Sequence, residues 1–257
     1  MKHYLHKFAD QAAYNTAKAG SSFYKPAVSL IEGDMSLRYD PLPPAPTIEM
    51  VDLGLTSETL WAKTNIGAQT ETDYGQYFAW GELAQYAGWP SDKSTHPYDW
   101  NEYIYAESKY NELTKYCNNS KYGYNGYTDE LTELVAADDI VAVTYGGSYR
   151  MPTQDDFQEL IDETDNEWVE DFNGSGVSGY KFTSKSDSSK YIFLPAAGYC
   201  YDSNLFNVGG EGGYWSSSLD ADDPYRAGYL FFTDGEVFMH YNNRCYGFSV
   251  RPVQHIS

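Results

Sequence analysis

Residues 229–240 read YLFFTDGEVFMH, two runs of alternating residues on either side of Asp234-Gly235. Asp-Gly tolerates the positive φ angles of a two-residue turn, so this pattern predicts a β-hairpin. The turn fixes the register, and side chains then alternate between the two faces of the hairpin. The expected pairs are Thr233 with Glu236, Phe232 with Val237, Phe231 with Phe238, Leu230 with Met239 and Tyr229 with His240.

The two faces of the predicted hairpin differ in chemistry. One carries the ordinary core residues Leu230, Phe232, Val237 and Met239. The other carries Tyr229, Phe231, Phe238 and His240, with Thr233 and Glu236 at the turn. Aromatic clusters with polar neighbours are typical of binding surfaces, whereas aromatic residues in strands usually pack inside. The second face is therefore either displayed for binding or is the second buried side of a sheet.

The composition limits the classes of partner. A chain of 257 residues can bury a sizeable core without disulfide staples. Its formal net charge of −20 would repel a phosphate backbone or an anionic membrane surface, so we expect no nucleic-acid partner. The 26 tyrosines exceed what a core requires. Tyrosine therefore either supplies contact area at a surface or reflects the tyrosine preference of strands.

The cysteines and the N-terminus carry no strong signal. Cys117, Cys200 and Cys245 have no C-x-x-C spacing, and their odd number argues against a disulfide framework. One Cys200–Cys245 bridge and free buried thiols both fit the sequence. The first residues lack the apolar stretch of a signal peptide, and no run has the length of a membrane span. We therefore expect synthesis in a cytoplasm without a signal, and no membrane insertion.

A proline-rich spacer, PLPPAP at residues 41–46, divides the chain because such a segment is stiff and extended. Before it, residues 9–19 predict a short helix that ends at a glycine. Residues 28–31 and 35–39 predict a small hairpin. We assign 1–46 to an attachment or oligomerisation segment and 47–257 to the main domain.

The main domain is predicted to be α+β, with two helices followed by antiparallel strands. The clearest helix begins after Thr153, which with Asp156 approximates a capping box. Its apolar stripe comprises Phe157, Leu160 and Ile161. The strands are expected at 48–55, 59–67, 168–172, 179–184, 190–195, 213–217, 226–233, 236–241 and 246–252.

Residues 84–128 are rich in Tyr, Asn and Ser and are interpreted as a long insertion. A helix is expected within it at about 101–116. A second, short helix is expected within 129–143, where Leu131, Leu134 and Val135 would share one face.

Six ordered segments together resemble the Fibrobacter succinogenes major paralogous domain, a family of gut Bacteroidetes and their phages. The segments are VDLGL with TLWA (51–62), YGQYFAWGE (74–82), YRMPT (149–153), FLPAAGY (193–199), YWSSS (214–218) and GFSVRPV (247–253). The resemblance covers about 48–253. It implies the C-type-lectin-like fold of formylglycine-generating enzymes and of variable proteins from diversity-generating retroelements.

In those retroelement systems, as the resemblance implies, adenines in a C-terminal repeat are mutagenised, so asparagine codons change while framework codons persist. The corresponding region here is about 199–253. Framework-type positions are Leu230, Phe232, Val237, Met239, Arg244, Gly247, Phe248 and Arg251. The target-binding positions that fit are Tyr201, Asp202, Ser203, Asn204, Asp220, Asp222, Asp223, Tyr225, Arg226, Tyr229, Phe231, Phe238, His240, Tyr241 and Tyr246. The resemblance thus favours a displayed aromatic face.

We therefore expect a non-enzymatic recognition protein that binds a protein or glycan on a target cell. The expected location is a phage tail in the virion, with 1–46 docking to the particle, and the resemblance also suggests a trimer. The alternatives are a fixed lectin or adhesin on a bacterial surface and a carbohydrate-active enzyme with two inward carboxylates. No cofactor or metal is expected, since the cysteines are far apart for a copper pair and Asp220–Asp223 lacks a calcium ligand loop.

Sequencing of the encoding locus across its source community would check the diversification. Substitutions are expected to concentrate at adenines in the codons for Tyr229, Phe231, Phe238, His240 and 220–226. Substitutions spread evenly over 199–253, or invariant codons at these positions, would contradict it and favour a protein with one fixed ligand.

Overall fold

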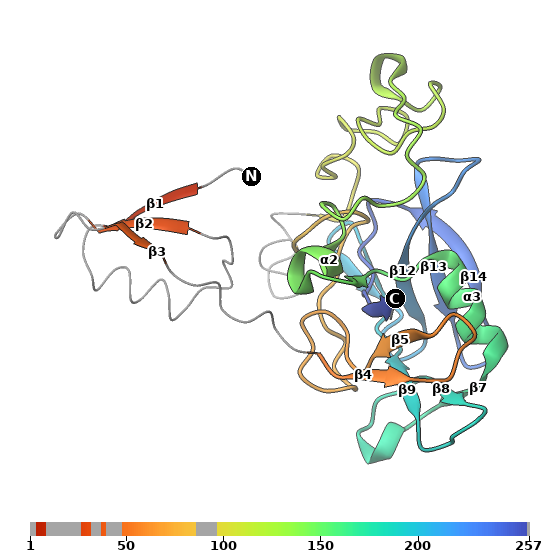
Figure 1. The fold of residues 1–257 in the computed structure, drawn as a ribbon. Helices are drawn as coiled ribbons and strands as arrows, with labels where there is room; N and C mark the ends of the chain where they lie inside the picture. Colours follow the sequence, from red (N-terminus) through yellow and green to blue (C-terminus); the bar gives the residue numbers. More distant parts are fainter. Residues whose placement is uncertain (1–3, 9–26, 32–36, 40–47, 86–96, 256–257) are drawn as a thin grey trace. The chain divides into compact units, whose positions relative to one another are not determined.

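The chain divides into two units, Met1–Pro46 and Thr47–Ser257. The computed structural model describes residues 4–8, 27–31, 37–39, 48–85 and 97–255 (Figure 1). No helix within these ranges is long and apolar enough to cross a membrane.

The first unit contains a three-stranded sheet. Strand β1 (Tyr4–Phe8) pairs in parallel with β2 (Ala27–Ile31), which pairs antiparallel with β3 (Leu37–Tyr39). The β2–β3 pair confirms the small predicted hairpin, whereas β1 was not predicted. The helix expected at 9–19 lies outside the described residues.

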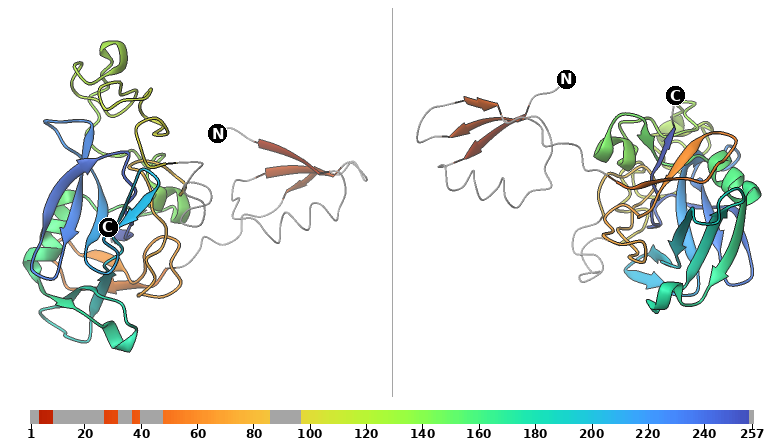
Figure 2. Two further views of the ribbon diagram at one scale, coloured as in Figure 1. Left: turned by 180° about the vertical axis from the view of Figure 1, so that it is seen from behind. Right: turned by 60° about the horizontal axis from the view of Figure 1, so that its bottom comes forward.

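The second unit combines two helices with antiparallel sheets among its described residues, which confirms a mixed α+β architecture. The helices are α2 (Ile140–Tyr145) and α3 (Gln154–Glu163). The strands, by sheet, are β4 (Met50–Asp52), β5 (Thr59–Ala62), β15 (Val253–His255) and β6 (Tyr149–Arg150); β7 (Thr164–Val169), β8 (Gly179–Ser184) and β9 (Tyr191–Pro195); β10 (Tyr199–Tyr201) and β11 (Asn204–Phe206); and β12 (Gly212–Leu219), β13 (Arg226–Phe232) and β14 (Val237–Asn243). Figure 2 shows the blue strands β12–β14 from two further directions.

The β13–β14 hairpin has the predicted register. Phe232 pairs with Val237 and Phe231 with Phe238, and the remaining pairs continue to Tyr229 with His240. Leu230 and Phe232 are fully buried in the main core. Helix α3 packs its Phe157 into the same core, where the ring lies 5.2 Å from that of Trp61. The hydrophobic face of the hairpin is therefore covered by α3, as Figure 1 shows.

The capping box of α3 is confirmed. The Thr153 hydroxyl accepts from the Asp156 backbone N–H at 3.1 Å, and an Asp156 carboxylate oxygen accepts from the Thr153 N–H at 2.6 Å. Asp156 also forms a bidentate pair with Arg150, with distances of 2.5 and 3.0 Å. Helix α3 is thus fixed to strand β6 at its first turn.

The helix predicted at 101–116 is wrong. This part of the insertion runs as irregular loops, the yellow to yellow-green trace at the top of Figure 1. Isolated bridges from Leu113 to Ala106 and Gly123 organise it, and Tyr116 has a positive φ of 56° that a helix does not allow. Tyr103, Leu113 and Tyr116 are fully or almost fully buried. The residues are therefore ordered by tertiary burial instead of helical periodicity.

The second helix begins later than predicted. Asp139 caps α2 by accepting from the N–H groups of Val141 and Ala142, at 2.8 and 3.2 Å. Upstream, the Leu134 N–H donates to the Ser217 carbonyl, and the chain lies along β12. The apolar spacing of 131–135 therefore reflects packing against a strand and not a helical face.

The strand predicted at 246–252 is replaced by single bonds to several neighbours. The N–H of Phe248 donates to Phe78, and the Ser249 carbonyl accepts from Trp215. A regular ladder begins only at Val253.

The three cysteines are free and buried. Cys200 and Cys245 belong to the same small core with Tyr98 and Tyr103. Of the two arrangements that the sequence allowed, the structure contains buried thiols.

Replacement of Asp156 by Asn is expected to lower the free energy of unfolding by about 2 kcal/mol at pH 7, because it weakens the cap and the pair with Arg150. Burial alone would raise the pKa of Asp156, but Arg150 and the cap hold it below its ordinary value. The stabilisation by Asp156 is therefore fully present above about pH 4, the pKa of an aspartate in the unfolded chain. It is lost as the pH falls through the lower pKa that Asp156 has in the folded chain. Urea titrations at pH 7 and pH 3 measure this.

The exposed neighbour Asp155 provides the matched control. Asp155→Asn is expected to change the unfolding free energy by less than about 0.5 kcal/mol, the usual limit for surface substitutions. If Asp156→Asn lowers the unfolding free energy as much at pH 3 as at pH 7, the ionised carboxylate of Asp156 is not the source of the stabilisation.

Candidate recognition surface

The aromatic side of the β13–β14 hairpin is only partly displayed. Phe238 is 38% exposed and His240 is exposed, whereas Tyr229 is only 4% exposed. Phe248 stacks on Tyr229 with ring centroids 4.6 Å apart and planes 10° apart. The expectation that Tyr229 is displayed is therefore corrected, because the distant segment around Phe248 covers it.

A continuous series of ring contacts joins the hairpin to the β10–β11 corner. The ring centroids of Tyr201 and Tyr246 are 4.6 Å apart. Those of Tyr246 and Tyr199 are 6.0 Å apart, and those of Tyr199 and Phe248 are 5.9 Å apart. Phe248 stacks on Tyr229, and from there the series continues along the hairpin. The centroid distances are 5.9 Å from Tyr229 to His240, 5.9 Å from His240 to Phe238 and 5.2 Å from Phe238 to Phe231. We call this set the aromatic belt; its members are Tyr199, Tyr201, Tyr229, Phe231, Phe238, His240, Tyr246 and Phe248.

Close backbone approach places Tyr201 beside Tyr246. Cys200 and Gly247 exchange backbone hydrogen bonds of 2.8 and 2.9 Å. A Cβ at Gly247 would lie 2.7 Å from the Tyr98 ring, so only glycine fits here. The β10–β11 turn that follows contains Asp202, with a φ of 49°, and the exposed Asn204. Ser203 between them is half-buried.

The acidic loop 220–226 is held by its own residues. The Arg226 guanidinium pairs with Asp220 at 2.8 Å and Asp223 at 2.7 Å. The buried Asp220 also accepts from the N–H groups of Asp222 and Asp223, at 3.0 and 3.3 Å. Asp222 itself is exposed. Asp220 and Arg226 thus shape the loop, and no group of metal-ligating side chains occurs within the described ranges.

Tyr225 connects this loop to the insertion. Its ring lies 5.2 Å from the rings of both Tyr110 and Tyr122. These rings line a hollow of about 430 Å³ that also contains Lys121 and Asn243. The sequence indicated Tyr225 but not its insertion partners, because nothing local relates 110–122 to 225.

The predicted positions therefore form two groups. Tyr201, Tyr246 and the hairpin positions Tyr229, Phe231, Phe238 and His240 meet in the aromatic belt, and Asp202, Ser203 and Asn204 lie in the adjoining β10–β11 turn. Those of 220–226 lie at the far end of β13–β14 from the Asp234-Gly235 turn, where Arg226 pairs with Asn243. Tyr241 belongs to neither group and its predicted place on the binding face is corrected. It is half-buried and pairs with Gly228, so alternation puts it on the face of Leu230 and Met239, opposite to the belt. Tyr199 and Phe248 were not predicted as site residues, although both lie in the segments that carry the resemblance.

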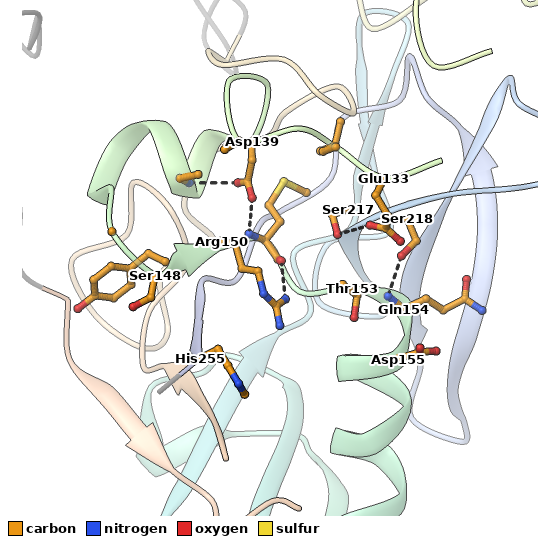
Figure 3. A pocket seen from close by; sticks show the side chains of 16 residues that line it. Glu133, Asp139, Ser148, Arg150, Thr153, Gln154, Asp155, Ser217, Ser218 and His255 are labelled. Carbon is orange, nitrogen blue, oxygen red and sulfur yellow. Dashed lines mark hydrogen bonds between the residues drawn. The ribbon is translucent and has the colours of Figure 1, made fainter. Parts of the chain in front are cut away.

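A polar groove of about 870 Å³ lies between α2, the start of α3 and β12 (Figure 3). Several of its polar side chains are bonded within the domain. Asp139 accepts from the Met151 N–H at 2.8 Å, the Ser217 hydroxyl donates to Glu133 at 2.8 Å, and Ser218 accepts from the Gln154 N–H at 3.0 Å. Burial raises the pKa of Asp139 despite these bonds. We assign these residues to holding the two helices against β12.

No protein-family model, curated protein or solved structure matches this chain.

The variants Tyr229→Ala and Phe238→Ala compare a buried residue of the belt with an exposed one. Tyr229→Ala is expected to lower the unfolding free energy by about 3–5 kcal/mol, because a buried ring leaves a cavity beneath Phe248. Phe238→Ala, at an exposed position of the same face, is expected to cost no more than about 1 kcal/mol. Urea unfolding followed by far-UV circular dichroism gives both values, and similar losses in the two variants would contradict the division.

Proposed function

We propose that this chain is a non-enzymatic recognition protein whose aromatic belt contacts a protein or glycan on a target cell. The observation that carries the proposal is the construction of the belt, in which exposed rings rest on less exposed ones. The exposed His240 stacks on the buried Tyr229, which stacks on Phe248, while Tyr201 packs on Tyr246 and Phe238 on Phe231. Such rings provide a large contact area.

Pre-ordered rings favour binding because little side-chain entropy is lost on association. Tyr and Phe have only two side-chain torsions, and their neighbours in the belt already restrict them. Tyr201 packs at 4.6 Å on Tyr246, and Phe238 at 5.2 Å on Phe231. The belt is therefore suited to recognition in its unbound form.

The fold also supports a surface that can change. Leu230 and Phe232 point into the core, while Phe231 and Phe238 alternate with them on the opposite side. Substitution on the outer side leaves the core contacts of α3 intact. This separation is what a diversified domain requires, and it supports a variable protein. The C-type-lectin-like fold, the place on a phage tail and the trimeric form are proposed from the family resemblance alone.

A fixed adhesin on a bacterial surface is the second candidate, and the same belt would serve it. The two differ in whether the codons of the exposed positions vary across the locus. A carbohydrate-active enzyme gains less support, because Asp139 and Glu133, two carboxylates of the large groove, are bonded to the domain itself.

Tyr201 and Tyr124 make a matched test of the belt, since both are tyrosines with 43% exposure and only Tyr201 belongs to it. Labelled full-length protein would be measured by flow cytometry against a panel of gut bacterial strains. Tyr201→Ala is expected to lower binding to a recognised strain at least tenfold, the loss of about 1.4 kcal/mol typical of an interface anchor. Tyr124→Ala is expected to bind within twofold of the wild type. Equal binding by both variants would refute the proposed surface.

A further inference from the structure

One acidic side chain lies within the aromatic surface. Glu211 precedes β12, and alternation along the strand places it on the same side as Gly213 and Trp215. That side is the one of the belt, because a Cβ at Gly213 would lie 2.4 Å from the Phe248 ring and Trp215 lies 4.6 Å from the same ring. The Glu211 carboxylate is therefore set beside aromatic rings.

The Glu211 carboxylate has an incomplete set of partners. It accepts one side-chain hydrogen bond, from the Asn207 amide at 2.7 Å. Within the described ranges it forms no ion pair, whereas Asp156 is paired with Arg150, and Asp220 and Asp223 are paired with Arg226. Glu211 is half-buried. A partly desolvated carboxylate without a cation is unfavourable by itself and becomes favourable when a cation binds.

The electrostatics of the belt agree with this arrangement. Burial raises the pKa of Glu211, although the hydrogen bond from Asn207 lowers it, in keeping with a carboxylate that forms no ion pair in the described ranges. Burial, and after it the charge of Glu211, raises the pKa of Tyr199 and of Tyr229. The charge of Glu211 thus acts on two residues of the belt.

We propose that the belt receives a lysine or arginine side chain of a protein target, with its cationic group against Glu211 and its stem along the rings of Tyr199 and Phe206. The inference rests on the proposed recognition function and specifies its ligand. Tyr199 and Phe206 stack at 5.4 Å, next to Asn207, which holds Glu211. Aromatic faces beside a carboxylate attract a cation through both the ring quadrupole and the full negative charge.

The net charge of the chain favours the same class of target. At a formal charge of −20, it attracts basic surfaces and increases their association rate. A neutral sugar would gain the aromatic contacts but would leave Glu211 without a counter-charge. Arginine fits both features because its planar guanidinium binds carboxylates and stacks on rings.

The test uses the full chain, labelled with ¹⁵N, and the peptide acetyl-Gly-Arg-Gly-amide. Its citrulline analogue has nearly the same shape without the charge, and N-acetylglucosamine represents a glycan. The protein variants are Glu211→Gln, which retains an oxygen to accept from Asn207, and Glu236→Gln. Glu236 is exposed at the turn of the β13–β14 hairpin, so its replacement removes the same charge outside the belt.

The arginine peptide is expected to shift the amide signals of 211–213 and 240. The citrulline peptide should bind at least tenfold more weakly, and Glu211→Gln should lose at least tenfold in affinity for the arginine peptide. Glu236→Gln should remain within twofold. The amide spectra themselves show whether each variant is folded.

The proposal is overturned if the arginine peptide leaves these signals unchanged, if citrulline binds equally, or if Glu211→Gln binds like the wild type. It is also overturned if N-acetylglucosamine, and neither of the two peptides, shifts the amide signals of 211–213 and 240. In each of these cases a loss of cell binding by Tyr201→Ala would still support the recognition function. Retention of cell binding by that variant would refute the recognition surface itself.

Discussion

The buried guanidinium of Arg244 joins three segments that are distant in the chain. Its Nε donates to the Tyr103 hydroxyl at 3.0 Å, and its Nη1 donates to the carbonyls of Tyr116 and Pro224 at 2.7 and 2.9 Å. It also lies 5.2 Å from the Trp80 ring. A charge that is fully buried must have its donors satisfied, so the irregular insertion and the 220–226 loop are held where their oxygens meet it. Removal of Arg244 would release both segments.

Arg251 has the same role beneath the sheets. Its three nitrogens donate to Asn65 and to the carbonyls of Ala62 and Phe193, at 2.8–2.9 Å. Burial lowers its pKa to about 10, so it stays charged at neutral pH. These two arginines bond the framework from within, and the exposed belt residues of β14, Phe238 and His240, lie outside that framework. The proposed binding surface depends on that separation.

The sequence predicted correctly those elements whose determining residues lie within a few positions of one another. The Asp234-Gly235 turn determines the register from Tyr229 to His240, and Thr153 with Asp156 determines the start of α3. The helix expected at 101–116 failed because its apolar residues are not buried along one helical face. Tyr103 and Tyr116 accept hydrogen bonds from Arg244, and the buried Leu113 is bridged to Ala106 and Gly123. The exposure of Tyr229 was mispredicted for a related reason, since its cover, Phe248, comes from a separate segment.

By itself, the sequence determined the class of fold, the hairpin with its four positions in the aromatic belt, and the capped helix, because turn preference, side-chain alternation and capping act between near neighbours. Tyr201 and Tyr246 were indicated only by the family resemblance. Only the tertiary structure decided which of those aromatic residues are exposed, how the insertion meets the 220–226 loop, and that Glu211 lies beside the rings without a cation. Burial and charge pairing depend on contacts between distant segments, and a single sequence does not contain those distances.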